Sequence, residues 1–220
     1  MEILTTGTQA VLKALLSESK GWSLRELAQV SGLSLGSVSH AMHVVSRMGL
    51  LRRDSQNRII VVSPQRIEQL LLSVTDLRAS VDTALFLPLR PQAIANEIEK
   101  ASRQASLPYA ITGPLGLWLH YKHVPPTDAY VYIAKADRNP WRISLKRVGA
   151  VRASPFNANL FLIETSDPHV LRNAVRVGSL SVAPIVQVYL DCTSMGGRFA
   201  EGAKELWSRT SESSRETPSK

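Results

Sequence analysis

Residues 8–62 carry the most constraining pattern in the chain, because helix signals, a tight turn and a hairpin follow one another at short spacing. An apolar stripe at helical spacing predicts a first helix over 8–16. Ser23, with Glu26 three residues later, matches a capping box and begins a second helix. Ser34 is a suitable N-cap for a third helix. The predicted order is therefore helix, helix, tight turn, helix.

A hairpin is predicted directly after the third helix. Two short apolar stretches, 50–52 and 58–62, are separated by the polar run 54–57, with basic residues near the tip. The segment from Ser23 to Arg53, SLRELAQVSGLSLGSVSHAMHVVSRMGLLRR, resembles the winged helix-turn-helix of transcription regulators. The resemblance implies that residues 1–63 form a DNA-binding domain.

The third helix is the element expected to read DNA. A single helix fits the major groove, where its outward side chains meet base edges and phosphates, and a basic hairpin can reach phosphates or an adjacent groove. The predicted contacts are the outward helix positions and the polar hairpin residues: Ser34, Gly36, Ser37, Ser39, His40, His43, Arg47, Arg52, Arg53, Asn57 and Arg58. This face carries no acidic residue, which favours DNA over the alternative of a purely protein-binding winged helix. Specific binding commonly uses two half-sites, so we expect a homodimer or multimer on operator repeats in double-stranded DNA.

The remainder of the chain predicts a connector and a mixed α/β domain, so the expected fold class is α+β. Residues 64–90 are interpreted as a connecting helix over 64–84 plus a linker, and residues 91–207 as the C-terminal domain. Residues 182–190 suit either a strand or a buried helix, and residues 208–220 predict a disordered tail. The other predicted helices cover 91–105, 114–121, 167–174 and 198–207, and the predicted strands cover 129–134, 143–148 and 159–164.

The charge balance favours a polyanionic or acidic partner. The chain has 26 Lys and Arg residues against 18 Asp and Glu residues, a net charge of +8. The densest basic stretch lies in the C-terminal half and opposes only Asp137. It comprises Lys135, Arg138, Arg142, Lys146, Arg147 and Arg152. We interpret it as a secondary basic patch, with an ordinary solvated face as the alternative.

Three short segments of the C-terminal half resemble, in order, the antitoxins of the AbiEi type. Tyr109 to Gly113 (YAITG) is similar to a YALTG signature, Val186 to Asp191 (VQVYLD) to a QLYLDL segment, and Arg198 to Leu206 to a closing GRxxEAAxxL helix. Ile111 and Cys192 stand where that pattern commonly has Leu. The resemblance implies an autoregulating repressor that is the antitoxin of a type IV toxin–antitoxin pair. Its functionally linked partner would be a nucleotidyltransferase-like toxin, and the basic patch would assist DNA binding.

Patterns typical of catalysis are missing from the sequence, so we expect no enzyme, no catalytic residues, no cofactor and no metal. The run 113–116 lacks the Lys-Ser/Thr pair of a phosphate loop, and no Asp-x-Asp pair is available for magnesium. His120 and His123 have a spacing that zinc ligands can share, but no Cys or Glu partner is nearby in sequence, so a surface pair is preferred. Cys192 is interpreted as buried packing.

The sequence therefore predicts a cytoplasmic, sequence-specific DNA-binding repressor of the antitoxin kind. The start of the chain lacks a basic and then apolar leader, and the apolar runs are too short to span a bilayer, so no membrane contact is expected. The alternative is a stand-alone winged-helix transcription or replication regulator whose C-terminal domain binds a ligand or a protein.

Overall fold

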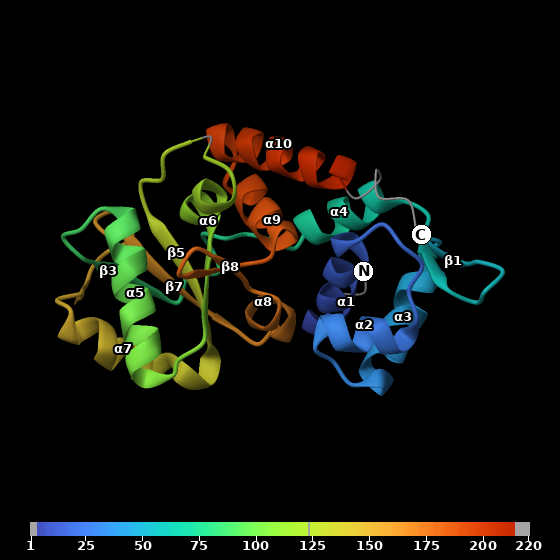
Figure 1. Cartoon of the computed structure of the whole chain (residues 1–220), viewed down its shortest axis with the longest axis horizontal. Helices are drawn as coiled ribbons and strands as arrows, with labels where there is room; N and C mark the ends of the chain where they lie inside the picture. Colours follow the sequence, from blue (N-terminus) through green and yellow to red (C-terminus); the bar gives the residue numbers. More distant parts are fainter. Residues whose placement is uncertain (1–3, 123, 214–220) are drawn as a thin grey trace.

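The computed structural model describes residues 4–122 and 124–213. They form an N-terminal unit, residues 4–63, and a larger C-terminal domain, residues 83–213, which lie side by side and are joined by helix α4 and a turn-rich segment (Figure 1). The N-terminal unit consists of α1 (Thr6–Ser17), α2 (Leu24–Ser31), α3 (Leu35–Arg47), β1 (Leu51–Arg53) and β2 (Ile59–Val61).

Local hydrogen bonds explain where the second and third helices begin. The Ser23 hydroxyl accepts a hydrogen bond from the Glu26 backbone N–H at 3.2 Å, and the Glu26 carboxylate accepts one from the Ser23 N–H at 2.7 Å. Gly32 ends α2 in the left-handed conformation at φ +73°. Ser34 then caps α3 by accepting from the Ser37 N–H at 3.2 Å. The predicted three helices, capping box and tight turn are confirmed.

The predicted hairpin is also confirmed, and a third segment joins it. Strands β1 and β2 pair antiparallel, with Leu51 opposite Val61 and Arg53 opposite Ile59. Trp22 forms an isolated antiparallel bridge with Ile59, so the residue preceding α2 is bonded to the inner strand of the wing. Trp22 is fully buried. The wing is thereby fixed to the helical part of the unit.

The helix predicted over 64–84 is only half as long. Helix α4 covers Pro64–Leu72, residues 73–74 and 77–80 form turns, and β3 covers Thr83–Phe86. Strand β3 belongs to the sheet of the C-terminal domain and lies inside the interval interpreted as a connector. The prediction failed because Val74 and Leu77 extend the apolar stripe past the end of the helix, although Leu77 is buried by the turn region and Val74 is exposed.

The C-terminal domain is built on one mixed, seven-stranded sheet in the order β6-β3-β7-β5-β4-β9-β8, so the α+β fold class is confirmed. The central β5 and β7 run parallel over six residue pairs, and β4 pairs with β9 in parallel as well. The strands after β3 are β4 (Tyr109–Thr112), β5 (Ala129–Ala134), β6 (Val151–Arg152), β7 (Leu160–Thr165), β8 (Val175–Val177) and β9 (Leu180–Val182). The helices are α5 (Pro91–Ala105), α6 (Gly113–His120), a short 3-10 turn (Lys135–Asp137), α7 (Arg138–Arg147), α8 (Pro168–Arg172), α9 (Ile185–Met195) and α10 (Gly197–Ser213).

Three predictions for this domain are corrected by the structure. The strand predicted over 143–148 is helical, because it lies in α7, where Trp141 and Leu145 form a buried stripe four residues apart. The ambiguous segment 182–190 divides into the end of β9 and the first half of α9. Helix α10 continues to Ser213, so the predicted tail is helical over 208–213, and residues 214–220 lie outside the described residues.

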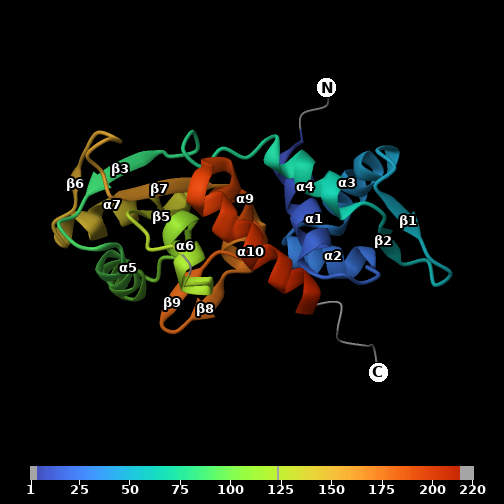
Figure 2. The same ribbon diagram turned by 90° about the horizontal axis from the view of Figure 1, so that it is seen from above.

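The N-terminal unit is packed against the C-terminal domain rather than tethered to it. Helix α1 contacts α4, α8 and α9, and α2 contacts α8. Helix α10 extends from the C-terminal domain to the N-terminal unit in both ribbon views (Figures 1 and 2). There the Trp207 indole N–H donates to the Glu68 carboxylate of α4 at 3.0 Å. One continuous buried core therefore includes residues of both parts.

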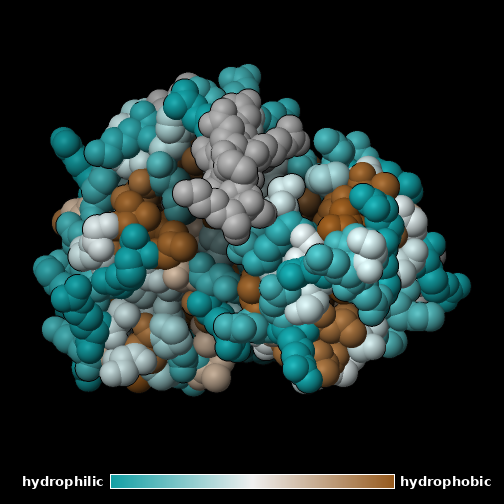
Figure 3. Space-filling model, turned by 45° about the vertical axis from the view of Figure 1, so that its right-hand side comes forward, coloured by the Kyte–Doolittle hydropathy of each residue, from teal (hydrophilic) through white to brown (hydrophobic). Residues whose placement is uncertain are grey.

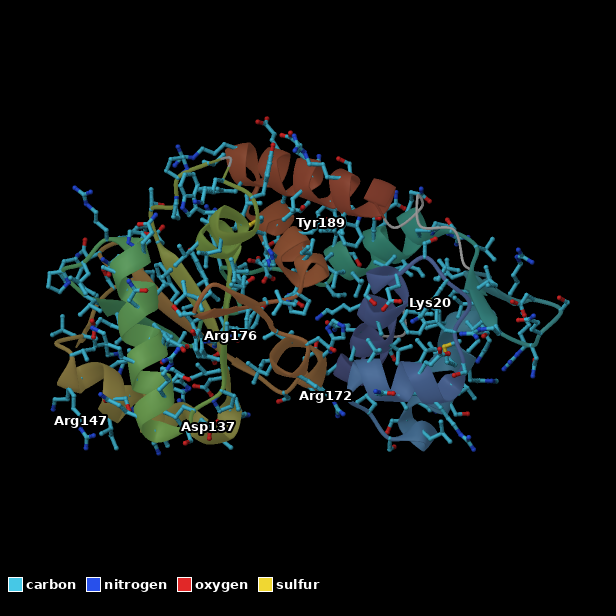
Figure 4. The ribbon with its side chains drawn as sticks, viewed as in Figure 1. Lys20, Asp137, Arg147, Arg172, Arg176 and Tyr189 are labelled. Carbon is cyan, nitrogen blue, oxygen red and sulfur yellow. The ribbon has the colours of Figure 1, made fainter. Side chains whose placement is uncertain are left out.

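Gly32 is required at this contact for two reasons. Its φ of +73° is unfavourable for residues with a side chain, and a Cβ there would lie 3.1 Å from the Pro168 Cβ and 3.2 Å from the Arg172 Cδ of α8. Arg172 is seen beside the N-terminal unit in Figure 4. The turn of the helix-turn-helix is thus also part of the contact between the two parts of the chain.

Candidate nucleic-acid interface

Helix α3 presents a polar outer face to solvent. Its inner face is buried by Val38, Ala41, Met42 and Val45, which recur at helical spacing. The remaining positions predicted to contact DNA all lie outward and are exposed: Ser34, Gly36, Ser37, Ser39, His40, His43 and Arg47. The outer face carries no carboxylate, and the free backbone N–H groups at the helix start favour an anion such as a phosphate.

Nothing in the described part of the chain packs substantially over this face. The main contacts of α3 are with α1, α2 and β1, all within the N-terminal unit. Both ribbon views place α3 and the wing at the end of the molecule away from α5 and α7 (Figures 1 and 2). On the face seen in Figure 3, hydrophilic side chains predominate and hydrophobic ones form separate patches. Within residues 4–122 and 124–213, no element therefore blocks the approach of a duplex to α3.

The wing residues divide into exposed cations and residues that hold the hairpin together. Arg52 is exposed on β1. Arg53 is exposed as well, and its Nη1 donates to the backbone oxygen of Asn57 at 2.9 Å and to its side-chain oxygen at 3.0 Å. Asn57 has a φ of +61°, which suits its place in the turn. Of the predicted wing contacts, Arg52 and Arg53 are the ones best placed for phosphates.

Arg58 is turned towards α2 instead of outward. Its Nε donates to the Gly21 carbonyl at 2.8 Å, and its Nη2 donates to the Glu26 carboxylate at 2.9 Å. Hydrogen bonds from Ser23 and the nearby guanidinium of Arg58 lower the pKa of Glu26 to about 2. The side chain of Arg58 is therefore already satisfied within the protein, and its predicted contact with DNA would require these bonds to break.

A groove of about 330 Å³ lies between α3 and the wing. Ser39, His43 and Ser46 form one wall, and Arg52 and Arg53 form the other. The structure thus brings the predicted helix and wing residues to one concave surface, with hydrogen-bonding groups on one side and cations on the other. This arrangement can hold a phosphate backbone beside a helix lying in the major groove.

The secondary basic patch is not part of this surface. Its residues lie on the 3-10 turn, α7 and β6, where Arg142, Lys146 and Arg152 line a groove of about 510 Å³. Arg138 is paired with Glu164 at 2.6 Å. Figure 4 shows Lys20 on the N-terminal unit and Arg147 on α7 towards opposite ends of the molecule. The patch is therefore a separate surface from the groove between α3 and the wing.

The structure also shows the surroundings of the cysteine and histidines that the sequence analysis weighed as a nucleophile or as metal ligands. Cys192 is fully buried, as predicted, and burial raises the pKa of its thiol. The His120 ring nitrogen Nε2 lies 3.1 Å from the Ala183 carbonyl, which makes it a partly buried hydrogen-bonding group, and His123 lies outside the described residues. No group of three or more His, Cys, Asp or Glu residues suited to a metal ion occurs among the described residues.

Sequence reasoning missed a buried polar network between the two parts of the chain. Lys13 of α1 pairs with Asp167 at 2.7 Å, and both side chains are less than one-tenth exposed. Asp191 is fully buried nearby and accepts hydrogen bonds from Tyr132 and Gln187. A usable signal existed, because Lys13 lies inside the apolar run 10–16 at a position that must face the interior.

Residues 8–55 match the sequence model of the IclR helix-turn-helix domain. Together with this match, the fold and the exposed α3–wing surface define a winged helix-turn-helix DNA-binding domain, and the chain is a DNA-binding transcriptional regulator. No curated protein and no solved structure matches the chain significantly. In residues 4–122 and 124–213, no helix is both long enough and apolar enough to cross a membrane.

Proposed function

We propose that the chain is a sequence-specific repressor that acts by binding double-stranded DNA and not by catalysis. The observation that carries this proposal is the exposed, acid-free outer face of α3 beside Arg52 and Arg53. Side chains on α3 read base edges, and the wing and the helix start contact phosphates. Bound at an operator, a body of this size blocks access to the promoter.

The repressor binds repeated half-sites as a dimer or multimer. The apolar residues Ile67 and Leu71 of α4 are fully buried against the chain itself, so they are not available for an apolar contact between copies. The contact between copies therefore uses other residues, or the copies meet only on DNA.

Fluorescence anisotropy with a duplex taken from upstream of the chain's own gene, and with a scrambled duplex, tests the DNA-binding surface. The double variant Arg52→Ala/Arg53→Ala should weaken binding to both duplexes. It should also flatten the salt dependence by up to about 0.9 in log–log slope per lost phosphate contact. Ser39→Ala or His40→Ala should instead reduce the preference for the upstream duplex.

Arg90→Ala is the matched control, because it removes an exposed arginine at the start of α5, which lies at the other end of the molecule and outside the basic patch (Figure 1). It should leave both affinities unchanged. If the α3 and wing variants all bind as the unmodified chain does, the α3 surface is not the DNA-binding site.

A second candidate function is that of an autoregulating type IV antitoxin. The observation in its favour is that residues from two of the segments resembling that family meet in space. Thr112 donates a hydrogen bond to Asp191, and Gln187 donates another to the same carboxylate at 2.8 Å. Co-expression with a nucleotidyltransferase-like toxin encoded beside the gene should restore growth. Repression of a distant promoter, with no protection from any such toxin, would support the alternative regulator with a ligand- or protein-binding C-terminal domain.

A further inference from the structure

A polar cavity of about 420 Å³ lies where the N-terminal unit meets the C-terminal domain. Gln9 and Lys13 of α1 form one wall, Asp76 and Asp82 come from the segment between α4 and β3, and Gln187 and Asp191 of α9 lie on the opposite side. This volume is within the range of small-molecule sites, although most such sites are more apolar. A ligand here would contact the DNA-binding unit and the sheet domain at once.

Carboxylates dominate the charge of this cavity. Of the residues that the structure describes, Lys13 is the only basic one that lines the cavity, and it is already paired with Asp167 at 2.7 Å. Glu164 is paired with Arg138, which lies outside the cavity. Asp76, Asp82 and Asp191 line the cavity without a cationic partner at salt-bridge distance among the described residues. The cavity therefore attracts a positive charge.

Gln187, one of the residues that line the cavity, carries an unsatisfied hydrogen-bond acceptor. Gln187 is 3% exposed, and its amide N–H groups are used by Asp191 at 2.8 Å and by the Tyr132 hydroxyl at 3.0 Å. Among the described residues, its Oε1 has no hydrogen-bond donor. Buried polar groups are rarely left without a partner, so this oxygen indicates a donor that the chain itself does not provide.

The adjacent carboxylate is hydrogen-bonded but fully buried. Asp191 is fully buried and accepts hydrogen bonds from Thr112, Tyr132 and Gln187. Burial raises its pKa to about 6, although these hydrogen bonds and the positive charge of Lys13 act in the opposite direction. A cationic N–H donor would stabilise the ionised carboxylate and satisfy Gln187 from the same position.

We propose that this cavity binds a small organic cation, an amine or a guanidinium compound, and that occupancy changes the affinity of the chain for DNA. The ammonium or guanidinium group lies against Asp191 and Gln187, and the remainder of the molecule extends past the hydroxyl-bearing walls towards Asp76. Because α1 forms one wall and also packs against α3, the ligand acts on the position of the DNA-reading helix. The effect on DNA rests on the proposed function, whereas binding of the cation does not.

Isothermal titration calorimetry of the full chain tests the site. Putrescine and agmatine are the cationic probes, and butane-1,4-diol is the neutral molecule that matches putrescine in length. At least one cation should bind and the diol should not. Asp191→Asn should weaken binding about tenfold or more, because it removes a charge-assisted hydrogen bond. Asp76→Asn, at the exposed rim, should weaken it without risk to the fold, and the exposed Glu201→Gln on α10 should leave it unchanged.

The outcomes distinguish the site from its effect on DNA. Failure of both cations to bind at millimolar concentration, equal binding of the diol, or full binding by both aspartate variants would overturn the site. Anisotropy with the upstream duplex should then show a change in affinity when the cation is added, and the change should be lost in Asp76→Asn. Any change in DNA affinity that remains in Asp76→Asn comes from a direct effect of the cation on DNA. A bound cation with unchanged DNA affinity overturns the coupling alone, and a chain that binds the cation but no DNA contradicts the proposed function alone.

Discussion

Arg52 and Arg58 lie on the same hairpin but have different surroundings, and this difference can be tested. Arg52→Ala should weaken DNA binding on any sequence and leave stability nearly unchanged, because the side chain is exposed. Arg58→Ala should lower the free energy of unfolding by about 1 kcal/mol, because Gly21 and Glu26 lose their donor at a half-exposed position. Urea titrations and anisotropy separate the two effects. If Arg58→Ala weakened DNA binding and left the free energy of unfolding unchanged, the contacts of Arg58 with Gly21 and Glu26 would not persist in solution.

His169 and Asp191 should make opposing contributions to the pH dependence of stability. Burial lowers the pKa of His169 to about 4, so the unfolded chain takes up a proton first and stability is lost as the pH falls from 6.5 towards 4. Burial raises the pKa of Asp191 from 3.8 to about 6, so the folded chain takes up the proton first and stability is gained as the pH falls through 6. The two effects nearly cancel between pH 7 and 4.5.

Replacing either side chain should reveal the contribution of the other to the pH dependence of stability. His169→Gln should become more stable relative to the unmodified chain as the pH falls from 7 to 4.5, by about 2 kcal/mol, and Asp191→Asn should become relatively less stable. Urea unfolding at pH 7, 5.5 and 4.5 measures both differences. If the free energy of unfolding changes with pH in the same way for the unmodified chain and both variants, the two side chains do not titrate as their burial implies.

Among the helices and strands, the N-terminal unit was predictable because its boundaries are encoded locally. Ser23, Glu26, Gly32 and Ser34 determine by their own hydrogen bonds and dihedral angles where α2 and α3 begin and end. The outward face of α3 followed from the spacing of its buried residues. The Arg58 contacts could not be predicted, since Gly21 and Glu26 are distant in sequence from the wing.

The errors in the C-terminal domain have a different origin. In α7, Ile143 suggested a strand, but it is 56% exposed and only Trp141 and Leu145 are buried. Strands such as β6 and β8 have two or three residues, too few for an alternating pattern, and form only because the sheet provides a partner. Lys13 and Asp167 are 154 positions apart, so the apolar run around Lys13 indicates that this lysine is buried but not which residue pairs with it.

Gly36, in the first turn of α3, offers a variant that separates stability from binding. A Cβ at this position would meet only the Ser34 Oγ at 4.0 Å, so the fold accommodates a side chain. Gly36→Glu should keep or slightly raise the free energy of unfolding, because a helical glycine is replaced and the helix start favours an acid. It should also repel phosphate and sharply weaken DNA binding at low salt. Gly36→Ala is the control, because it adds a side chain without a charge. Equal DNA binding by the two variants would show that the phosphate lies elsewhere.

Across the whole molecule, the Lys13–Asp167 pair tests whether the two parts unfold together. Lys13→Met leaves Asp167 buried without a partner and should cost about 3–5 kcal/mol, the usual penalty for breaking a buried pair. Asp167→Asn keeps the oxygen that accepts from the His169 N–H and leaves Lys13 unpaired, so it should also destabilise. The double variant should recover part of the loss, because neither charge then remains buried alone.

The losses of stability in Lys13→Met and Asp167→Asn should be non-additive only if the N-terminal unit and the C-terminal domain unfold in one transition. Urea unfolding followed by circular dichroism and by tryptophan fluorescence provides that check, since Trp22 lies in the N-terminal unit and Trp141 in the sheet domain. Coincident curves and a double variant more stable than the sum of the single losses are expected. Additive losses, or two separate transitions, would mean that the N-terminal unit detaches from the sheet domain at little cost, and the cavity between them would not persist.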